Sequence, residues 1–333
     1  MKIIVDAMGG DNAPDEIVRG AVNAAARLGV KVRLVGKGEE ILRALQKIGM
    51  DDLPDGVKIV NATEVIEFDD DPVKAIQEKK DSSMAVGCRL LRDGRGDAFV
   101  SAGNTGALLS GATLIVGRVR GIRRAALAPV LPSKTGRFIL IDCGANAECT
   151  AEYLLQFAFM GSFYAENVLE IKSPRIGLLN NGTESTKGTS LQQEAYALLK
   201  NTSLNFIGNI EAKEALQGVC DVLVCDGFTG NAVLKSIEGT ASFIMSELKA
   251  VYMSGIITKL SALLIKSKMS TLKDKMNPDA IGGTALLGIS KPVLKAHGSS
   301  NAEAISSAIE RAVNEVNCDV ASRLRENIDK MKT

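Results

Sequence analysis

The 333-residue chain is poor in aromatic and histidine side chains. It has no tryptophan, its aromatic share is 4%, and His297 is its only histidine. It also lacks an excess of charge of either sign, because 40 Lys and Arg against 39 Asp and Glu leave a net charge of +1. A protein that holds nucleic acid through a strongly basic surface needs such an excess. We therefore expect no nucleic-acid partner.

Membrane-spanning and metal-binding signals are missing as well. No run of about 18 apolar residues occurs, so a transmembrane helix is not expected, and the first residues, MKIIVDAMGG, do not look like a signal peptide. The cysteines show no CxxC spacing, and with one histidine in the chain a zinc site is not expected. We predict a cytoplasmic protein with reduced, mostly buried thiols. The cysteines are Cys88, Cys143, Cys149, Cys220, Cys225 and Cys318.

What the chain does have is an alternation of short β-rich runs with longer helical patterns. Apolar residues at helical spacing mark 14–29, 38–48, 82–93, 148–167 and 189–200. This alternation predicts an α/β fold with a largely parallel sheet that is covered by helices on both faces. No repeat or linker interrupts it, so we predict a single unit over 1–333, in which two lobes could share the sheet. The strand candidates are 2–7, 31–36, 57–60, 97–102, 137–142, 175–180, 205–209, 221–225 and 292–296.

The last helix has the clearest pattern. Apolar residues recur every three or four positions from Ile305 to Ile328, and Ser300 with Glu303 forms a capping-box pattern. We therefore predict one helix that begins two or three residues after His297.

Small polar loops follow six of the predicted strands. In parallel sheets ligands bind outside the carboxyl ends of the strands. Glycine lets backbone N–H groups approach a ligand, and the start of the next helix favours an anion. We therefore predict that the loops converge on a polar, anion-binding cleft. They are DAMGGDNAP (6–14), SAGNTG (101–106), DCGANAE (142–148), NGTESTKG (181–188), DGFTGN (226–231) and AHGSS (296–300).

Nucleotide and metal sites fit these loops less well. GKGEEI (36–41) lacks the third glycine of a dinucleotide fingerprint, and GTESTKGT (182–189) has Lys-Gly where a P-loop has Gly-Lys. Strand-end aspartates could hold a divalent metal, but they more often cap helices and brace turns. No GxSxG motif marks a covalent nucleophile, although a serine could pair with His297 in space. The four aspartates are Asp6, Asp11, Asp142 and Asp226.

Residues 254–276 differ in character from the rest of the chain. They interleave apolar side chains with lysines, which is typical of a basic amphipathic helix. Such a helix either packs on the core or on a twin subunit, or it contacts an anionic surface such as a lipid leaflet or an acidic protein. The residues expected to make this contact are Ile256, Ile257, Leu260, Leu263, Leu264, Lys266 and Lys268.

Taken together, the loops resemble those of a known family. The motifs DAMGGDNAP, SAGNTGA, LNNGTESTKG, CDGFTGN and KAHGSSN, in this order along the whole chain, are similar to those of the PlsX family, the bacterial acyl-carrier-protein:phosphate acyltransferases. Asn12 departs from the pattern, because DAMGGDHAP is expected there. The resemblance implies a doubly wound α/β/α fold, similar to phosphate acetyltransferases and to isocitrate/isopropylmalate dehydrogenases. It also implies a homodimer with a cleft and no metal or nucleotide cofactor.

The resemblance further implies a function. Members of the family transfer a long acyl chain from acyl carrier protein to inorganic phosphate. The acyl phosphate then feeds a membrane glycerol-3-phosphate acyltransferase in phospholipid synthesis. The family is cytoplasmic and peripherally membrane-associated, and residues 254–276 lie where membrane contact is expected.

Attack of phosphate on a thioester demands little of the protein. Phosphate is already largely dianionic at neutral pH, with a pKa of about 6, and a thiolate with a pKa of about 8.5 leaves readily. The site must supply a phosphate cradle, an oxyanion hole and an apolar slot for the chain. We assign Lys187, Asn231 and His297 to catalysis. The expected phosphate- or substrate-binding residues are Asp6, Gly9, Gly10, Gly103, Asn104, Thr105, Gly106, Asp142, Asn146, Thr183, Asp226, Thr229, Gly230 and Ser299.

Two other functions stay open at this point. A metal-dependent 2-hydroxyacid dehydrogenase could use a similar fold, and a non-enzymatic regulator could bind acyl groups and dock on the membrane. Two residues also have plainer interpretations. Lys187 could be a solvated loop lysine, and His297 could serve only to satisfy loop backbone groups.

Overall fold

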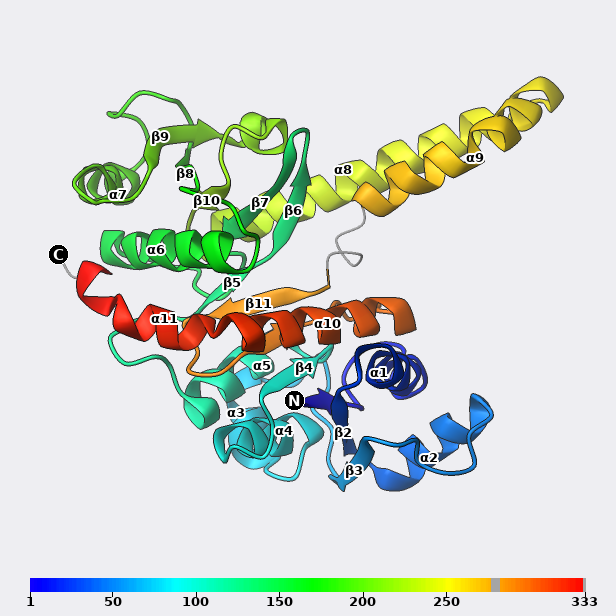
Figure 1. Ribbon diagram of the computed structural model, residues 1–333. Coiled ribbons are helices and arrows are strands. Elements are labelled where there is room, and N and C mark those ends of the chain that lie inside the picture. Colours follow the sequence, from blue (N-terminus) through cyan, green and yellow to red (C-terminus); the bar gives the residue numbers. More distant parts are fainter. Residues whose placement is uncertain (277–281, 332–333) are drawn as a thin grey trace.

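A computed structural model describes residues 1–276 and 282–331 (Figure 1). The strands form two sheets, not one shared sheet. The first has the order β3-β2-β1-β4-β12-β11-β5 and is parallel except that β11 runs antiparallel to β12 and β5. The second has the order β6-β7-β10-β8-β9, with β6 antiparallel to β7. We call each sheet with its helices the first and the second lobe.

The elements alternate as the sequence predicts. The strands are β1 (Lys2–Asp6), β2 (Lys31–Gly36), β3 (Val57–Asn61), β4 (Ala98–Ser101), β5 (Ala126–Ala128), β6 (Val130–Ser133), β7 (Gly136–Ile141), β8 (Ile176–Asn180), β9 (Phe206–Glu211), β10 (Val222–Val224), β11 (Thr284–Leu287) and β12 (Val293–Lys295). The helices are α1 (Asp15–Leu28), α2 (Gly38–Lys47), α3 (Pro72–Glu78), α4 (Ser83–Arg92), α5 (Thr105–Gly111), η1 (Ala112–Val116), α6 (Ala151–Asn167), α7 (Ser190–Lys200), η2 (Ala212–Gln217), α8 (Gly227–Met253), α9 (Ile256–Met276), α10 (Ala302–Cys318), α11 (Val320–Glu326) and η4 (Ile328–Met331).

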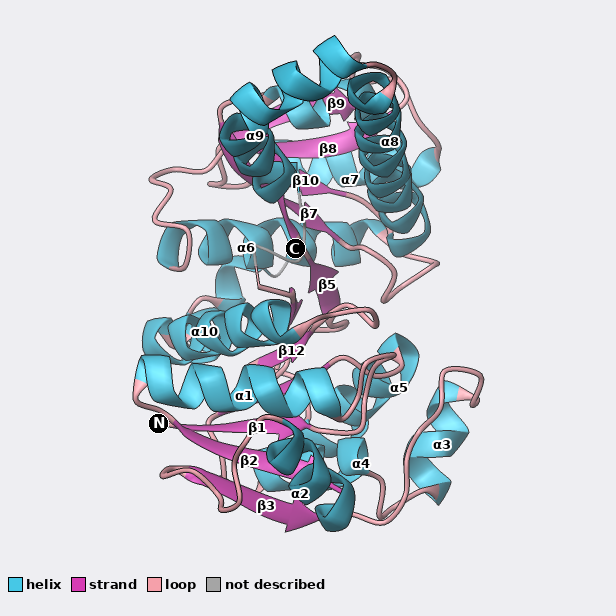
Figure 2. Cartoon of the chain, turned by 90° about the vertical axis from the view of Figure 1, so that its right-hand side faces the viewer, coloured by secondary structure: helices cyan, strands magenta, loops and turns pink. Residues whose placement is uncertain are grey.

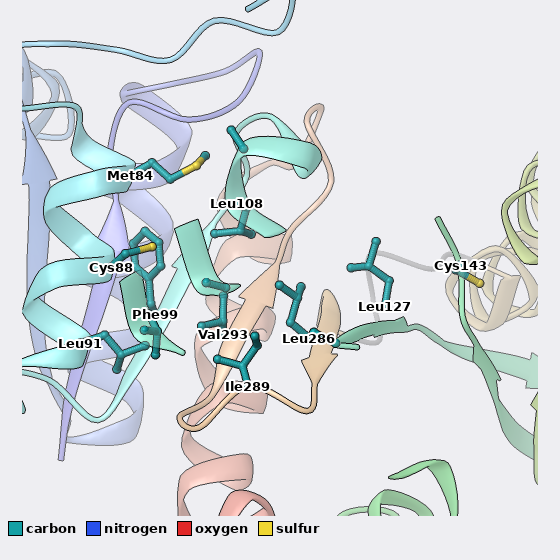
Figure 3. Close-up of a cluster of buried hydrophobic side chains, with 14 of the residues drawn as sticks. Met84, Cys88, Leu91, Phe99, Leu108, Leu127, Cys143, Leu286, Ile289 and Val293 are labelled. Carbon is teal, nitrogen blue, oxygen red and sulfur yellow. The ribbon is translucent and has the colours of Figure 1, made fainter. Parts of the chain in front are cut away.

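Helices cover both faces of the first sheet because successive strand residues point to opposite sides. Ile3 of β1 belongs to a buried cluster with α1 and α10, whereas Ile4 packs with α4 and α5. Figure 3 shows Met84 of α4 and Phe99 of β4 in this second cluster. A Cβ on Gly87 of α4 would lie 2.4 Å from the Phe99 ring, so glycine allows the helix to approach the strand.

The second lobe is layered in the same way. Ile141 and Val222 pack with α6 on one face, while Leu223 packs with the first turns of α8 on the other. Beyond the sheet, α8 continues outward and α9 returns beside it, so the two helices project as an arm (Figure 1). Among residues 1–276 and 282–331, no helix combines the length and apolar content that crossing a bilayer requires.

The C-terminal helix differs from its prediction at both ends. Asn301, not Ser300, caps it, because the Asn301 side chain accepts the N–H of Ala304 at 2.9 Å. The helix also breaks at Asp319, which takes a left-handed φ of 46°, before α11 begins. The predicted capping box and the unbroken helix to Ile328 are therefore wrong.

A buried polar network joins the two lobes. Tyr164 of α6 donates to Glu315 Oε1 at 2.7 Å and accepts from Arg311 Nε at 2.9 Å, both from α10. Arg311 also donates to the carbonyl of Gly283, at 3.2 Å. Burial raises the pKa of Glu315 to about 7. The network holds α10, which belongs to the first lobe, against α6 of the second.

Three short strands, β5, β6 and β11, had no clear sequence signal. The segment AALAPVLPS (125–133) has no alternation, and two prolines interrupt it. Its strands exist because neighbouring strands pair with them: Leu127 with Leu286, and Leu131 with Phe138.

Candidate active site

A hollow of about 380 Å³ lies between the two lobes, at the carboxyl ends of their parallel strands. Figure 2 shows the strands β1, β2, β3 and β12 of the first sheet in the lower half of the view and the strands β7, β8, β9 and β10 of the second sheet in the upper half. We call this space the cleft hollow. Its walls include Asp11, Phe68, Thr105, Leu127, Val130, Cys143, Asn231, Leu234, Lys235, Glu238, Thr284, Lys295, His297 and Gly298. Five of the six predicted loops contribute to these walls, and the loop 181–188 does not. They meet at a cleft between two sheets and not along one sheet edge.

In the first lobe, the loop after β1 is tied to the loop after β12. The N–H of Asp11 donates to Gly298 O at 2.8 Å, and Asn12 Nδ2 donates to Ser299 O at 3.1 Å. Gly10 takes a left-handed φ of 112°, and a Cβ there would lie 3.0 Å from Gly298 O. Asn12, which stands where the family pattern has histidine, therefore uses its amide to hold the two loops together.

Asp6 lies behind this wall, not in the hollow. It is 1% exposed and accepts from Ser101 Oγ at 2.7 Å and from the N–H of Met8 at 3.2 Å. Burial raises its pKa. A Cβ on Gly9 would lie 2.6 Å from the Asp6 carboxylate and 2.7 Å from Gly103 N, so these loops are packed backbone to backbone. Asp6, Gly9 and Gly103 therefore support the wall.

The loop after β4 presents one side chain to the hollow. Asn104 is engaged as the cap of α5: its oxygen accepts the N–H of Ala107 at 3.0 Å and its nitrogen donates to Phe68 O at 3.0 Å. Gly106 packs against Pro72, 2.8 Å from where its Cβ would be. Thr105 remains exposed and lines the cleft hollow.

In the second lobe, Asp142 is the counterpart of Asp6. It is 0% exposed and accepts four hydrogen bonds: from the N–H groups of Leu127 at 2.9 Å, Ala145 at 3.2 Å and Asn146 at 2.7 Å, and from Asn146 Nδ2 at 2.9 Å. Burial raises the pKa of Asp142. Asn146 also donates to Ala125 O, at 2.8 Å. Both residues hold the loop after β7 and do not reach the hollow.

The loop after β10 becomes the first turn of α8. Asp226 caps the helix by accepting the Thr229 N–H at 2.8 Å and the Thr229 hydroxyl at 2.7 Å. A Cβ on Gly230 would lie 1.9 Å from Asp142 O, so α8 begins in direct contact with the Asp142 loop. Asn231 is the next residue, and its exposed side chain faces the cleft hollow.

His297 lines the hollow together with Asn231 and Thr105. Its Nδ1 lies 2.8 Å from Ser299 Oγ and accepts the Ser299 N–H at 3.3 Å. A ring nitrogen that accepts an N–H carries no proton of its own, so neutral His297 bears its proton on Nε2. Ser299 thus holds the Nδ1 side of the His297 ring, which leaves the Nε2–H as the donor on the other side.

Lys187 and Thr183 lie apart from this group. Both are exposed on the loop after β8, which is braced by Asn209 Nδ2 donating to Glu184 O at 2.7 Å and by Asn180 Nδ2 donating to Lys187 O at 3.1 Å. This loop borders a different hollow, on another flank of α8, whose walls include Asn180, Gly188, Thr189, Thr229 and Val233. Asn231 and His297 therefore share one hollow, and Lys187 is not among its lining residues.

Several lining residues were not predicted. Asp11 and Lys295 stand inside the DAMGGDNAP and KAHGSSN motifs, whereas Phe68, Lys235 and Glu238 belong to no motif. In the part of the chain that the structure describes, no three His, Cys, Asp or Glu side chains gather closely enough to hold a metal ion. The strand-end aspartates other than Asp11 are used as caps and braces.

A family model described as "Fatty acid synthesis protein" matches residues 1–323. Proteins named phosphate acyltransferase are similar over the full length. That of Thermoanaerobacter pseudethanolicus is 49% identical over 332 residues, covering 99% of this chain and 98% of its own, and that of Geobacillus thermodenitrificans is 48% identical over 332 residues, covering 99% of each.

Solved structures share the fold. A phosphotransacetylase from Streptococcus pyogenes matches with a TM-score of 0.65 at 19% identity, over 95% of this chain and 94% of its own. A branched-chain phosphotransacylase from Enterococcus faecalis matches with a TM-score of 0.60 at 15% identity, over 95% of this chain and 99% of its own. The predicted α/β fold, with its likeness to phosphate acetyltransferases, is confirmed.

Proposed function

Since the chain belongs to the fatty acid synthesis protein family, which its loop motifs resemble, we propose that it transfers an acyl group to inorganic phosphate in the cleft hollow. The observation that carries this assignment is the meeting of Thr105, Asn231 and His297, from both lobes, in one space to which each brings a hydrogen-bonding side chain. Such a space suits two small anionic centres, the phosphate and the oxyanion that forms on the thioester carbonyl.

The reaction needs no covalent enzyme intermediate. A phosphate oxygen bonds to the thioester carbon, the C–S bond breaks, and the departing thiolate takes a proton. Cys143 is the thiol that lines the cleft hollow, but burial raises its pKa well above the ordinary range. It is therefore not a ready thiolate nucleophile. Direct attack by phosphate agrees with this environment.

We assign roles to the side chains by their hydrogen-bonding capacity. The Asn231 amide donates to the oxyanion, since it stands exposed at the start of α8. His297 donates from Nε2 to phosphate or to the leaving sulfur, and Thr105 donates its hydroxyl to phosphate. Lys187 remains a proposed catalytic residue. Its position beside the second hollow favours contact with the acyl donor over contact with phosphate.

An apolar hollow of about 700 Å³ is the place we propose for the acyl chain. It runs along α8 between β6 and η2, on the flank opposite the cleft hollow, and Glu238 lines both spaces. Its walls carry Leu131, Leu216, Val233, Ile237 and Ile244. Burial of a long acyl chain there contributes about 0.8 kcal/mol for each methylene that is removed from water.

The family resemblance extends the proposal to partners. The acyl donor is acyl carrier protein carrying a fatty acyl chain, and the product feeds a membrane glycerol-3-phosphate acyltransferase. The protein acts in the cytoplasm as a homodimer that associates peripherally with the membrane. The exposed apolar side chains of α9, with Ile256 81% and Leu264 88% exposed, support contact with lipid or with a twin.

The test is to incubate the protein with phosphate and palmitoyl-acyl carrier protein and to trap acyl phosphate with hydroxylamine. We expect phosphate-dependent loss of the thioester. Without it the transferase assignment fails, and a regulator that only binds acyl groups becomes the better description. NAD reduction with a 2-hydroxy acid and a divalent metal would instead reveal a dehydrogenase.

Variants test the residue roles in the same assay. Asn231→Ala should lower turnover about 100-fold, as loss of one oxyanion donor does. His297→Ala should impair turnover without abolishing it, because phosphate arrives ionised. If Lys187→Ala and Asn231→Ala both keep full turnover, the site is elsewhere.

A further inference from the structure

Phe228 is an aromatic residue of the DGFTGN loop that the roles above leave unused. It is the second residue of α8, and it is 74% exposed, more than any other large apolar side chain that the structure describes outside α9. The backbone that carries it is closely packed, because a Cβ on Gly227 would lie 2.6 Å from Asn146 O and one on Gly230 would lie 1.9 Å from Asp142 O. A firmly held first turn of α8 therefore presents an uncovered ring.

Helix geometry places this ring between the cleft hollow and the second hollow. Asn231 lines the cleft hollow, and Thr229 lines the second hollow. Successive residues of an α-helix are turned by about 100°, so Asn231 and Thr229 lie about 160° apart around the axis, and Phe228 falls between them, about 60° from Asn231. A ligand that reaches from one hollow to the other over this side of the helix passes across Phe228.

The second hollow has a volume of about 410 Å³ and offers side chains that suit an amide-bearing ligand. Asn181 and Gln192 line it. The Gln192 oxygen accepts the N–H of Thr189 at 3.1 Å, which holds the side chain and leaves its nitrogen as a donor. Within the described residues, neither this nitrogen nor the Asn181 side chain has a hydrogen-bond partner. Both therefore remain available to the amide groups of a ligand.

A thioester donor has two sides, and each needs its own way out of the cleft hollow. The acyl chain is proposed to leave past Glu238, which lies about 10 Å beyond Asn231 along α8. The first turn of α8, with Phe228, lies in the other direction along the helix. In an acyl carrier protein the thiol ends a phosphopantetheine arm, which carries amide groups along its length and a phosphate next to the protein. This order of groups matches an apolar ring, a hollow with amide side chains and the exposed Lys187 on the loop that borders it.

We propose that Phe228 and the second hollow bind the phosphopantetheine arm of the acyl donor. This inference rests on the proposed function and adds the path by which the thioester enters the cleft hollow. The arm lies across the Phe228 ring, its amides bond to Asn181 and Gln192, and its phosphate contacts Lys187. The thioester carbonyl at its end then meets Asn231.

Phe243 offers a matched control on the same helix. It is 64% exposed, and it is not among the described residues that line the cleft hollow or the second hollow. Replacing either phenylalanine by alanine removes the same ring from an exposed helix position. Neither variant should lose stability, and the unfolding midpoint without ligand checks this. The two variants differ in whether the lost ring lies on the proposed path of the arm.

The first experiment measures turnover as a function of the concentration of each substrate. Phe228→Ala should raise the KM for palmitoyl-acyl carrier protein by about 10-fold, because the arm no longer covers an apolar ring. The KM for phosphate should stay unchanged, and kcat should change less than the KM for the donor. Phe243→Ala should keep the wild-type values. A wild-type donor KM in Phe228→Ala, or an equal rise in Phe243→Ala, overturns the proposal.

A second measurement separates the arm from the body of the carrier protein. Phosphopantetheine, added without protein or acyl group, should raise the thermal unfolding midpoint of the wild type and of Phe243→Ala more than that of Phe228→Ala. Pantetheine, which lacks the phosphate, should give a smaller shift, and Lys187→Met should remove the difference between the two compounds. If Phe228→Ala raises the donor KM but leaves the phosphopantetheine shift unchanged, the ring contacts the carrier protein itself and the proposal fails.

The same measurement distinguishes this inference from the transferase assignment. If the wild type makes no acyl phosphate and still shows the Phe228-dependent shift with phosphopantetheine, the transferase assignment fails and the arm site stands. If turnover is normal and phosphopantetheine gives no shift in the wild type, the arm site fails alone.

Discussion

Helix α8 begins in the cleft and ends in the projecting arm, and its two ends are built in opposite ways. At the cleft end there is no room for a Cβ: one on Gly227 would lie 2.6 Å from Asn146 O, and one on Gly230 would lie 1.9 Å from Asp142 O. Along the arm, Gly239 has nothing within 4 Å of its Cβ position, and Phe243 is 64% exposed.

The difference shows that the two ends of one helix are constrained by different contacts. The first turn is determined by backbone contacts with the Asp142 loop, which leave glycine as the residue that fits. The arm instead carries apolar side chains that the described residues of this chain leave exposed, a feature typical of surfaces that contact other molecules. Substitutions at the two ends should therefore affect different properties.

The largest effect is expected at the cleft end, from Gly230→Ala. The added methyl group would overlap the Asp142 carbonyl oxygen, and relieving this overlap requires a shift of the backbone. We expect a loss of about 3 kcal/mol of stability and, because Asn231 is displaced with the helix, at least a 100-fold loss of turnover. Turnover and the thermal unfolding midpoint measure these effects. A variant with wild-type values for both would show that the tight contact has no consequence.

The buried network of Tyr164, Arg311 and Glu315 between the lobes can be weakened by a substitution that leaves both ends of α8 unchanged. Glu315 has a pKa raised to about 7 by burial, against 4.5 when unfolded. The folded protein therefore binds the proton more tightly, so this residue's contribution to stability is full below pH 4.5 and is lost as pH rises to 7. Glu315→Gln, which keeps an acceptor for Tyr164, should remove about 2–3 kcal/mol of pH dependence.

Urea unfolding at pH 4.5, 6 and 7.5 measures this difference. The wild type should lose stability relative to Glu315→Gln as pH rises. Equal slopes for the two proteins would contradict the assigned pKa, and binding to vesicles should be the same for both because the arm is unaffected.

At the arm, Leu264→Glu should weaken binding to anionic lipid vesicles by at least tenfold. Removing an exposed leucine from a lipid contact forfeits about 1.5–3 kcal/mol, while turnover with carrier-protein substrate in solution should be kept. Sedimentation with vesicles measures the first and the hydroxylamine assay the second. Gln46→Glu adds the same charge on α2 and should bind vesicles like the wild type. If Leu264→Glu binds normally but changes the oligomeric state, the arm contacts a twin subunit.

The smallest effect is expected from Gly239→Ala, the counterpart of the cleft-end variant. Its Cβ meets open space, and alanine favours the helix by about 0.5–1 kcal/mol over glycine. The unfolding midpoint should rise slightly and turnover should stay unchanged. A loss of activity here would mean that the arm and the cleft are coupled.

Much of the fold was predictable because it follows local periodicity. Each predicted strand is present within a few residues, as is each predicted helix except the last, and the loop motifs identified the family. The features that were not predicted lack a local sequence signal. Short strands such as β5 form through pairing with residues that are distant in sequence. The C-terminal helix breaks at Asp319, where no glycine or proline in the sequence indicates a helix end.

The candidate site likewise contains residues whose position was predicted correctly and residues whose position was not. Thr105, Asn231 and His297 were predicted from motif positions at strand ends and do share one hollow. Asp6 and Asp142 came from the same motifs, yet both are buried behind the walls. Lys187 also came from a motif, yet it is not among the residues that line this hollow.

The linear order of residues thus establishes the α/β class, the family and the glycines that let loops meet. It does so because these depend on spacing along one chain. The division into two sheets, the choice of which polar groups face the cleft, and the exposure of the arm were decided by tertiary structure. They depend on contacts such as Asp11 with Gly298 and Asp142 with Leu127, whose partners are far apart in sequence or lie in different strands and leave no periodic trace.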